Sequence, residues 1–108
     1  MVSNAYFGAI RSLGFAGISG AYAVVGSAFT EMVRIICFSN GTEGDVLFTN
    51  NVTQDQVFVA AGANKLYDIQ SNINPQFDDK YVIPIGTQWY VKQLEAPVSG
   101  SVYIETIF

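Results

Sequence analysis

Short runs rich in β-branched and aromatic residues recur along the chain, and turn-forming residues separate them. Such runs, about eight to twelve residues apart, are typical of a sandwich or barrel. Helical periodicity is scarce, and 5–12 is the best place for a short helix or an arm. The pattern predicts an all-β antiparallel sandwich, jelly-roll-like, of about eight strands. The runs that predict strands are Phe15–Ile18, Tyr22–Val25, Val33–Phe38, Asp45–Thr49, Gln56–Ala60, Lys65–Ile69, Tyr81–Ile83, Gln88–Lys92 and Val102–Phe108.

The length fits one domain. At 108 residues and 11.7 kDa, folding could bury about two thirds of the surface that the unfolded chain exposes, which is enough for one modest core. Within that domain we expect residues 1–30 to supply an N-terminal arm and the first strands. Residues 31–108 are expected to form the core of the sandwich.

The predicted strands are apolar on both sides. A strand with one solvated face alternates apolar and polar residues. In Val33–Phe38, however, Ile35 and Cys37 lie on one face, and Ile36 and Phe38 lie on the other. A loop or the N-terminal segment could cover the second face, but we favour a neighbouring subunit. The residues expected at that interface are Phe7, Phe15, Ile36, Phe38, Tyr103 and Ile107.

Charge is sparse and slightly acidic. Only 13% of the residues are charged, about half the usual share, and the net charge is −4. The five basic residues are scattered, whereas nucleic-acid binding needs several Lys or Arg acting together. We therefore expect neither nucleic acid nor an anionic membrane as a partner. A chain so poor in charge suits a homo-oligomer, in which protein covers part of each surface.

The uncharged stretch from residue 12 to residue 30 could suggest a signal peptide or a membrane span. Glycine and serine interrupt it too often for a span of about 20 apolar residues, and its basic start is Arg11 alone. We expect neither. The single Cys37 lies in an apolar run and is expected to pack as a small hydrophobe, which fits a reducing compartment.

Catalytic chemistry has little support. The chain has no histidine and one cysteine, which excludes a Ser–His–acid triad, a Cys–His pair and the common zinc sites. Asp78 and Asp79 are adjacent, and adjacent carboxylates rarely face each other across a cleft, so we interpret this pair as part of a loop. We predict no enzyme activity, no cofactor and no metal. The two Asn-x-Thr sequences that begin at Asn40 and Asn51 are interpreted as turns.

Two adjacent aromatic residues, Trp89 and Tyr90, are the remaining candidates for a site. Aromatic side chains on an exposed sheet can stack on sugars or anchor a protein contact. The alternative is that both residues pack in the core. On the first interpretation the protein is a receptor- or carbohydrate-binding module.

The order of several strand and turn motifs resembles a family. Over residues 33–108 the chain is similar to small β-sandwich proteins encoded beside structural genes of tailed bacteriophages. The resemblance implies a virion structural protein, a capsid decoration or a neck or tail accessory, made in the host cytoplasm and assembled with itself and other virion proteins. In the first hairpin, TNNVTQD replaces the usual aspartates. The matching residues are Arg34, Ile35, Asn40, Leu66, Asp68, Ser71, Asn72, Gly86, Thr87, Tyr90, Val91, Lys92, Gly100, Ser101, Val102 and Tyr103.

Overall fold

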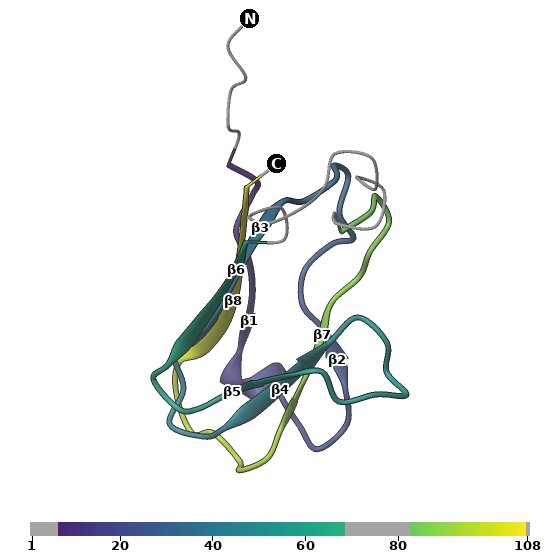
Figure 1. The fold of residues 1–108 in the computed structure, drawn as a ribbon. Helices are drawn as coiled ribbons and strands as arrows, with labels where there is room; N and C mark the ends of the chain where they lie inside the picture. Colours follow the sequence, from purple (N-terminus) through teal and green to yellow (C-terminus); the bar gives the residue numbers. More distant parts are fainter. Residues whose placement is uncertain (1–6, 69–82, 108) are drawn as a thin grey trace, which may run out of the picture.

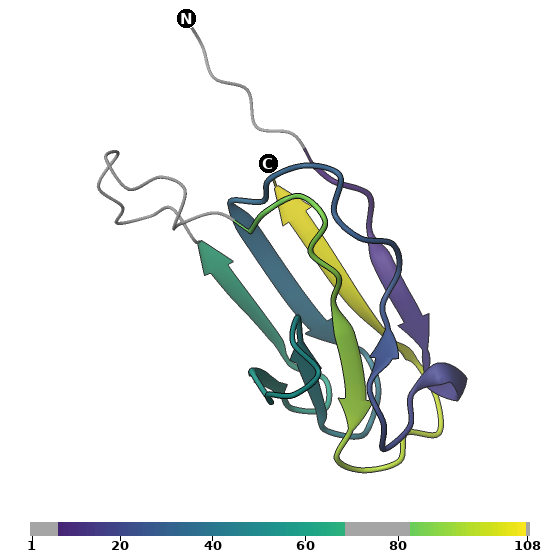
Figure 2. The ribbon, with the colours of Figure 1, turned by 90° about the vertical axis from the view of Figure 1, so that its right-hand side faces the viewer.

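Two four-stranded antiparallel sheets pack face to face in the computed structural model, which describes residues 7–68 and 83–107. Figures 1 and 2 show the two layers from perpendicular directions. The first sheet has the order β1 (Arg11–Gly14), β8 (Ser101–Ile107), β3 (Ile35–Asn40) and β6 (Asn64–Asp68). The second has the order β2 (Ala23–Val24), β7 (Tyr90–Gln93), β4 (Val46–Thr49) and β5 (Val57–Val59).

The strand order follows from one long antiparallel hairpin that is folded over twice. Its two arms pair strand by strand, β4 with β5, β3 with β6, β2 with β7 and β1 with β8. Folding the hairpin over adds the lateral pairs β3·β8 and β4·β7, which close the two sheets. This is the eight-stranded jelly roll. The predicted fold class is therefore confirmed.

The N-terminal part differs in detail from the prediction. Phe15–Gly17 forms a short 3-10 helix, η1, so the strand predicted at Phe15–Ile18 is wrong. The first strand is instead Arg11–Gly14, which overlaps the stretch expected to form an arm or a short helix. The strand ends at Gly14. The N–H of the next residue, Phe15, donates to the Gly100 carbonyl oxygen at 3.0 Å, and η1 begins there.

Other predicted strands are found within a few residues of their expected limits. Of the strand predicted at Tyr81–Ile83, only Ile83 lies within the described residues, where it forms an isolated bridge with Val33. The acidic pair Asp78 and Asp79 lies outside them. The first strands from residues 1–30 are part of the sandwich, because β1 pairs with β8 and β2 pairs with β7.

The core lies between the sheets and is built by strict alternation. In β3, Ile36, Phe38 and Asn40 are buried, while the residues that alternate with them, such as Ile35 and Cys37, are only half-buried. Period-two alternation in β3 and β8 sends every second side chain inward, whereas all five residues of β6 are exposed. The buried apolar residues are Ile18, Val25, Phe29, Val33, Ile36, Phe38, Val46, Phe48, Val57, Val59, Ile83, Trp89, Val91, Val102 and Ile104.

Arg11 is an unusual inward-pointing residue of β1. It pairs with Ile104, whose side chain is buried, so its own side chain enters the same layer. The guanidinium lies 4.5 Å from the centroid of the Phe29 ring. Its nitrogens donate to the carbonyl oxygens of Ser27, at 2.7 Å, and Ala9, at 3.1 Å. Arg11 thereby fastens β1 to the segment that leads into β3.

Both Asn-x-Thr sequences form the same turn, as the sequence predicts. Asn40 Oδ1 accepts from Thr42 N at 3.0 Å and from Thr42 Oγ1 at 2.6 Å. Asn51 Oδ1 accepts in the same way from Thr53 N at 3.2 Å and Thr53 Oγ1 at 2.7 Å. Only the Asn40 turn is buried, so its amide cannot turn to solvent.

The buried amide of Asn40 joins three segments. Its Nδ2 donates to the carbonyl oxygens of Gly44, at 2.7 Å, and Val59, at 3.1 Å, while Oδ1 accepts from Thr42. Buried polar groups that lose their partners cost far more than an average hydrogen bond contributes. Asn40 therefore holds the β3–β4 turn against the end of β5.

We expect Asn40→Ala to lower the free energy of unfolding by about 3 kcal/mol, because it leaves buried carbonyl and N–H groups without partners. Urea unfolding followed by circular dichroism measures the change. The matched control is Asn64→Ala on the exposed strand β6, which should stay within about 0.5 kcal/mol of the wild type. Equal losses for the two variants would contradict the role assigned to the buried amide.

Candidate functional site

The outward side of the first sheet carries a group of apolar side chains, which we call the outer face. Phe7 is 81% exposed and Leu66 is 66% exposed, and the others are partly exposed. Isolated apolar residues are normal on a protein surface, but a contiguous group marks an interaction site. The outer face consists of Phe7, Ile35, Cys37, Leu66, Tyr103 and Ile107.

Strand register brings these residues together from distant parts of the chain. Ile107 pairs with Ile35 and also forms an isolated bridge with Phe7, so these three form one row across the sheet. In the next row Glu105, Cys37 and Leu66 stand side by side. Directly paired residues in antiparallel strands present their side chains on the same face. Two rows therefore place four apolar strand side chains and Phe7 beside one another.

A shallow depression of about 90 Å³ lies between the two rows, lined by Phe7, Ile35, Cys37, Leu66, Glu105, Thr106 and Ile107. Its one acidic residue, Glu105, is exposed beside Cys37. Asp68, which is exposed and pairs with Ile35, lies at the end of the first row. The outer face is thus apolar with two carboxylates in it. Such a surface can accept an apolar side chain from another molecule, and a basic group opposite Glu105 would improve the fit.

The structure corrects the predicted interface at Ile36 and Phe38. Both side chains are only 1% exposed and lie in the core, where Phe38 packs on Phe48 and Trp89. The sequence showed two apolar faces on this strand, and the face that contains Ile36 and Phe38 is the one that the second sheet covers. Ile35 and Cys37 therefore take their place on the outer face.

The other predicted interface residues separate into two groups. Phe7, Tyr103 and Ile107 lie on the outer face, although Tyr103 is in a third row beside Ser39. Phe15 is partly exposed in η1, next to Gly100 at the start of β8, which is the far end of that strand from Ile107. Phe15 thus does not belong to this group.

Besides Ile35 and Cys37, the sequence analysis missed Leu66 as an interface position. Its signal was the alternation in Lys65–Asp68, which sets Leu66 and Asp68 opposite Lys65 and Tyr67. Without the register, nothing in the sequence tells which pair points outward. The pairing of Leu66 with half-buried Cys37 decides it.

The predicted ligand-contact pair does not form one surface. Trp89 is 6% exposed and packs against Phe38, with the ring centroids 4.7 Å apart. Tyr90 is half-buried and pairs with Val24 and Thr49 on the opposite side of the second sheet. Consecutive strand residues point to opposite faces, so Trp89 and Tyr90 cannot stack on the same ligand.

Trp89 instead lines a pocket between the sheets. The pocket has a volume of about 250 Å³ and is bounded by Ile36, Phe38, Asn50, Val57, Tyr67, Ile83 and Trp89. The buried Nε1 of Trp89 is the one buried side-chain nitrogen or oxygen without a hydrogen-bond partner in the described parts of the chain. The pocket is therefore apolar, with an indole among its walls whose N–H is unused.

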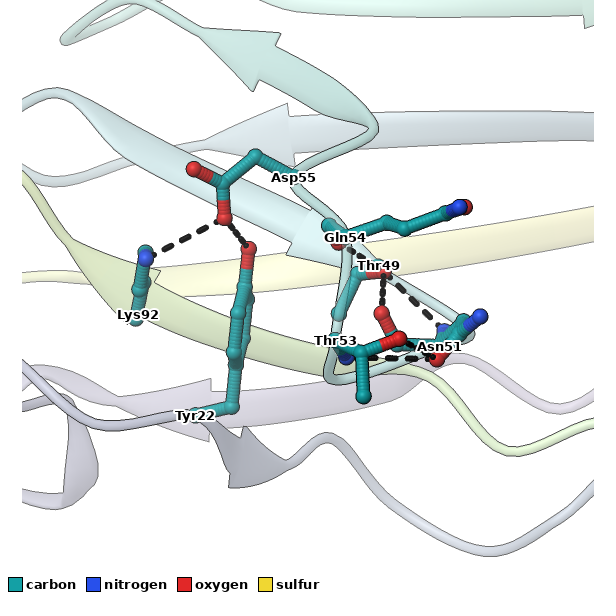
Figure 3. Close-up of polar contacts among 7 residues, drawn as sticks. All are labelled: Tyr22, Thr49, Asn51, Thr53, Gln54, Asp55 and Lys92. Atoms are coloured by element: carbon teal, nitrogen blue, oxygen red, sulfur yellow. Dashed lines mark hydrogen bonds and ion pairs between the residues drawn. The ribbon is translucent and has the colours of Figure 1, made fainter.

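A polar cluster of Tyr22, Asp55 and Lys92 lies on the outward side of the second sheet (Figure 3). Tyr22 Oη donates to Asp55 Oδ1 at 2.5 Å, and Lys92 Nζ lies 3.1 Å from the same oxygen. Lys92 Nζ also lies 4.8 Å from the centroid of the Tyr22 ring. The three groups tie the β4–β5 loop to β7 and to the segment before β2.

The cluster shifts two pKa values in opposite directions. The hydrogen bond from Tyr22 and then the contact with Lys92 hold the pKa of Asp55 below its usual range. Burial, with the Asp55 carboxylate beside it, raises the pKa of Tyr22. Both changes favour the observed pair of a protonated phenol and an ionised carboxylate.

The β4–β5 loop itself is held by Thr49 and Asn51 (Figure 3). Thr49 Oγ1 lies 2.7 Å from the carbonyl oxygens of both Asn51 and Gln54, and it accepts from Asn51 N at 3.0 Å. Asn51 Oδ1 accepts from Thr53, as described above. These hydrogen bonds within the loop hold its polar tip in a defined turn.

Residues 7–68 and 83–107 contain neither a cluster of metal ligands nor a membrane-spanning helix. No group of three or more Asp, Glu, Cys or His side chains there is placed to hold a metal ion. No helix in those ranges is long and apolar enough to cross a membrane.

Comparison of the chain with protein-family models, with curated proteins and with solved structures gave no match.

We expect Tyr22→Phe to raise the pKa of Asp55 toward its ordinary value, because the variant removes the hydrogen bond that contributes most to the shift. A pH titration of the carboxyl carbon by NMR measures it. The folded-state pKa lies below the unfolded one, so the stabilisation is present above the unfolded pKa and is lost as the pH falls through the folded pKa.

The matched control for this titration is Tyr103→Phe, which removes a hydroxyl from the other sheet. It should leave the Asp55 titration unchanged, since Tyr103 lies on the outer face of the first sheet. An Asp55 pKa that stays low in Tyr22→Phe would show that Lys92 alone holds the carboxylate.

Proposed function

We propose that this protein is a non-enzymatic structural component of a tailed-bacteriophage virion, which assembles with copies of itself and with other virion proteins through the outer face. A capsid decoration and a neck or tail accessory both fit this role. The virion part of the proposal rests on the resemblance over residues 33–108. The assembly part rests on the first sheet.

The observation that carries the proposal is the outer face itself. Phe7 and Leu66 expose most of their surface. Phe7 bridges to Ile107, and Leu66 pairs with Cys37. Burial of apolar surface is the main favourable term in protein association, at about 25 cal/mol per Å². A surface of this kind is stabilised when a second molecule covers it.

Two further features support a structural role. Only 13% of the residues are charged, so much of the surface can lie against protein at little desolvation cost. The fold is a jelly roll, an architecture that builds viral capsid proteins as well as lectins. The second point is an analogy at the level of the fold, which by itself assigns no function.

A carbohydrate- or receptor-binding module is the alternative raised by the sequence. This alternative requires the side chains of Trp89 and Tyr90 to lie together on one exposed surface. Trp89 is buried in the core and Tyr90 faces the other way, so the aromatic platform that this alternative needs is missing at those residues. Assembly through the first sheet is therefore the better-supported function.

We expect the wild-type protein to self-associate, with a solution mass that is a fixed multiple of 11.7 kDa in light scattering. Leu66→Lys should return the mass to that of the monomer, because an ammonium buried in the contact loses its hydration. In the monomer position 66 lies on the exposed edge strand β6, two residues from Asp68 on the same face, so the fold should tolerate the lysine.

The matched control is Val52→Lys, which adds the same charge at a 53% exposed apolar residue of the β4–β5 loop and should leave the mass unchanged. Measurements at two protein concentrations about a hundredfold apart separate a stable oligomer from a weak one by mass action. A wild-type monomer at both concentrations would contradict self-association. An equal effect of both lysines would move the interface away from the outer face.

A further inference from the structure

Among the described residues, β6 is the longest strand at the edge of a sheet. The edge strands are β1, β2, β5 and β6, with four, two, three and five residues, and every residue of β6 is exposed. We propose that two copies of the protein pair through β6, antiparallel, about a two-fold axis at Leu66. This pair adds a second contact to the self-association proposed above, and it rests on that function only where it joins the outer faces.

The hydrogen bonds of β3 show how its backbone alternates between its two neighbours. Asn40 N donates to Ala63 O at 2.9 Å, on the side of β6. Gly41 N donates to Ser101 O at 2.9 Å, on the side of β8. Successive residues of an inner antiparallel strand direct their backbone groups to opposite neighbours. Phe38 therefore bonds to β6, as Asn40 bonds to the residue before it.

This alternation turns the backbone groups of Asn64 and Leu66 toward the free edge. Lys65 is opposite Phe38 and forms the hydrogen-bonded pair, whereas Leu66 is opposite Cys37 in a non-hydrogen-bonded pair. The N–H and C=O of Leu66 thus point away from β3, and no other strand of the described chain lies on that side. Exposed backbone groups of this kind are a template for a strand of another molecule.

The side chains of β6 favour a register with Leu66 on the axis. A two-fold pair of antiparallel strands sets residues of the same face opposite each other, so the axis passes through one residue. With Leu66 there, the two leucine side chains lie side by side on the outer face. On the inner face Lys65 lies beside Tyr67 of the second copy, and at the ends Asn64 lies beside Asp68. No like charges meet.

The neighbouring symmetric registers are less favourable. With Lys65 on the axis, two ammonium groups would lie directly opposite each other, which destabilises a strand pair. With Tyr67 on the axis, the apolar side chain of Leu66 would lie against the carboxylate of Asp68. Only the axis at Leu66 lets the two Leu66 residues exchange both of their N–H···O bonds, as a hydrogen-bonded pair does.

The devices that usually block an edge strand are missing from this edge. Proteins protect edges with proline, with a bulge or with a charge that points inward. β6 has no proline and pairs with β3 in unbroken register over its five residues. Lys65 points inward, but its Nζ lies 5.6 Å from the centroid of the Phe58 ring on β5. The ammonium is therefore held toward the second sheet and leaves the edge open.

The pair would also join the outer faces of the two copies. Leu66 ends the row that contains Cys37 and Glu105. When two Leu66 side chains meet at the axis, this row continues through the Cys37 of the second copy. One wider apolar surface then faces the next molecule of the assembly.

Amide hydrogen exchange of the wild type tests the pair without a substitution. At a free edge the Lys65 amide is protected by its bond to β3, whereas the Leu66 amide exchanges as an unprotected one. In the pair both are protected. We expect exchange at Leu66 to slow at least about tenfold when the protein concentration is raised about a hundredfold, with Lys65 much less affected.

The register has its own readout. Lys65 and Tyr67 of the second copy form a non-hydrogen-bonded pair, in which the Cα atoms lie about 4.5 Å apart. A sample that mixes labelled and unlabelled copies should therefore show an intermolecular NOE between the Hα atoms of these two residues. An intermolecular NOE between the two Lys65 Hα atoms instead would overturn the axis at Leu66.

A matched pair of variants tests the backbone contact. Asn64→Pro removes an N–H that faces the free edge and keeps the bonds to β3, a position that proline tolerates. Asn64→Ala removes the same side chain and keeps the N–H. We expect Asn64→Pro to weaken association about tenfold, since each copy loses a hydrogen bond, and Asn64→Ala to change it less than about twofold. Circular dichroism shows that each variant is folded.

Phe7→Lys separates a failure of this proposal from a failure of the proposed function, because β8 and β3 lie between Phe7 and β6. Dissociation by Phe7→Lys alone would overturn the edge pair and leave the outer-face contact standing. Dissociation by Asn64→Pro alone would support the edge pair and count against the outer face as the self-contact. A Leu66 amide that stays unprotected at the higher concentration would overturn the edge pair whatever the variants show.

Discussion

The ring of Phe38 lies between the two sheets, 4.9 Å from the centroid of Phe48 and 4.7 Å from that of Trp89. It projects from β3, an inner strand of the first sheet, and both of its partners belong to the second layer. Offset and edge-to-face aromatic pairs add to the free energy of burial. Once Phe38 points inward, the direction of every other side chain on β3 is fixed.

That constraint gives the two faces of β3 different roles. Ile36 and Phe38 face inward, where they form both the core and one wall of the pocket. Ile35 and Cys37 face outward, where the register with β6 and β8 joins them to Leu66 and Ile107. A shift of one residue in β3 would exchange the two sets. The core and the candidate interface are therefore consequences of the same pairing.

The sequence predicted the architecture better than it predicted the site. Turn residues and β-rich runs indicated the jelly roll, because those signals are local and recur around the sandwich. The direction of a strand is not local when both faces are apolar, and Ile36 and Phe38 were accordingly assigned to the wrong face. Trp89 is similar: an aromatic residue beside a turn looks the same in sequence whether it is buried or exposed. For Arg11–Gly14, the pairing with β8 decides the strand, and the short sequence RSLG carries little strand propensity of its own.

The nested pairing has a consequence for the order in which the fold can form during protein synthesis. The β4–β5 hairpin joins neighbours in sequence and can close as soon as Val59 has left the ribosome. β1, in contrast, has β8 as its partner, and Arg11 meets Ile104 only when nearly all of the described chain has emerged. Loop-closure entropy makes such distant pairs slow to form. The nascent protein must therefore keep the edge of β3 that β8 will occupy open until late in translation, and in that interval it is most exposed to pairing with the wrong strand.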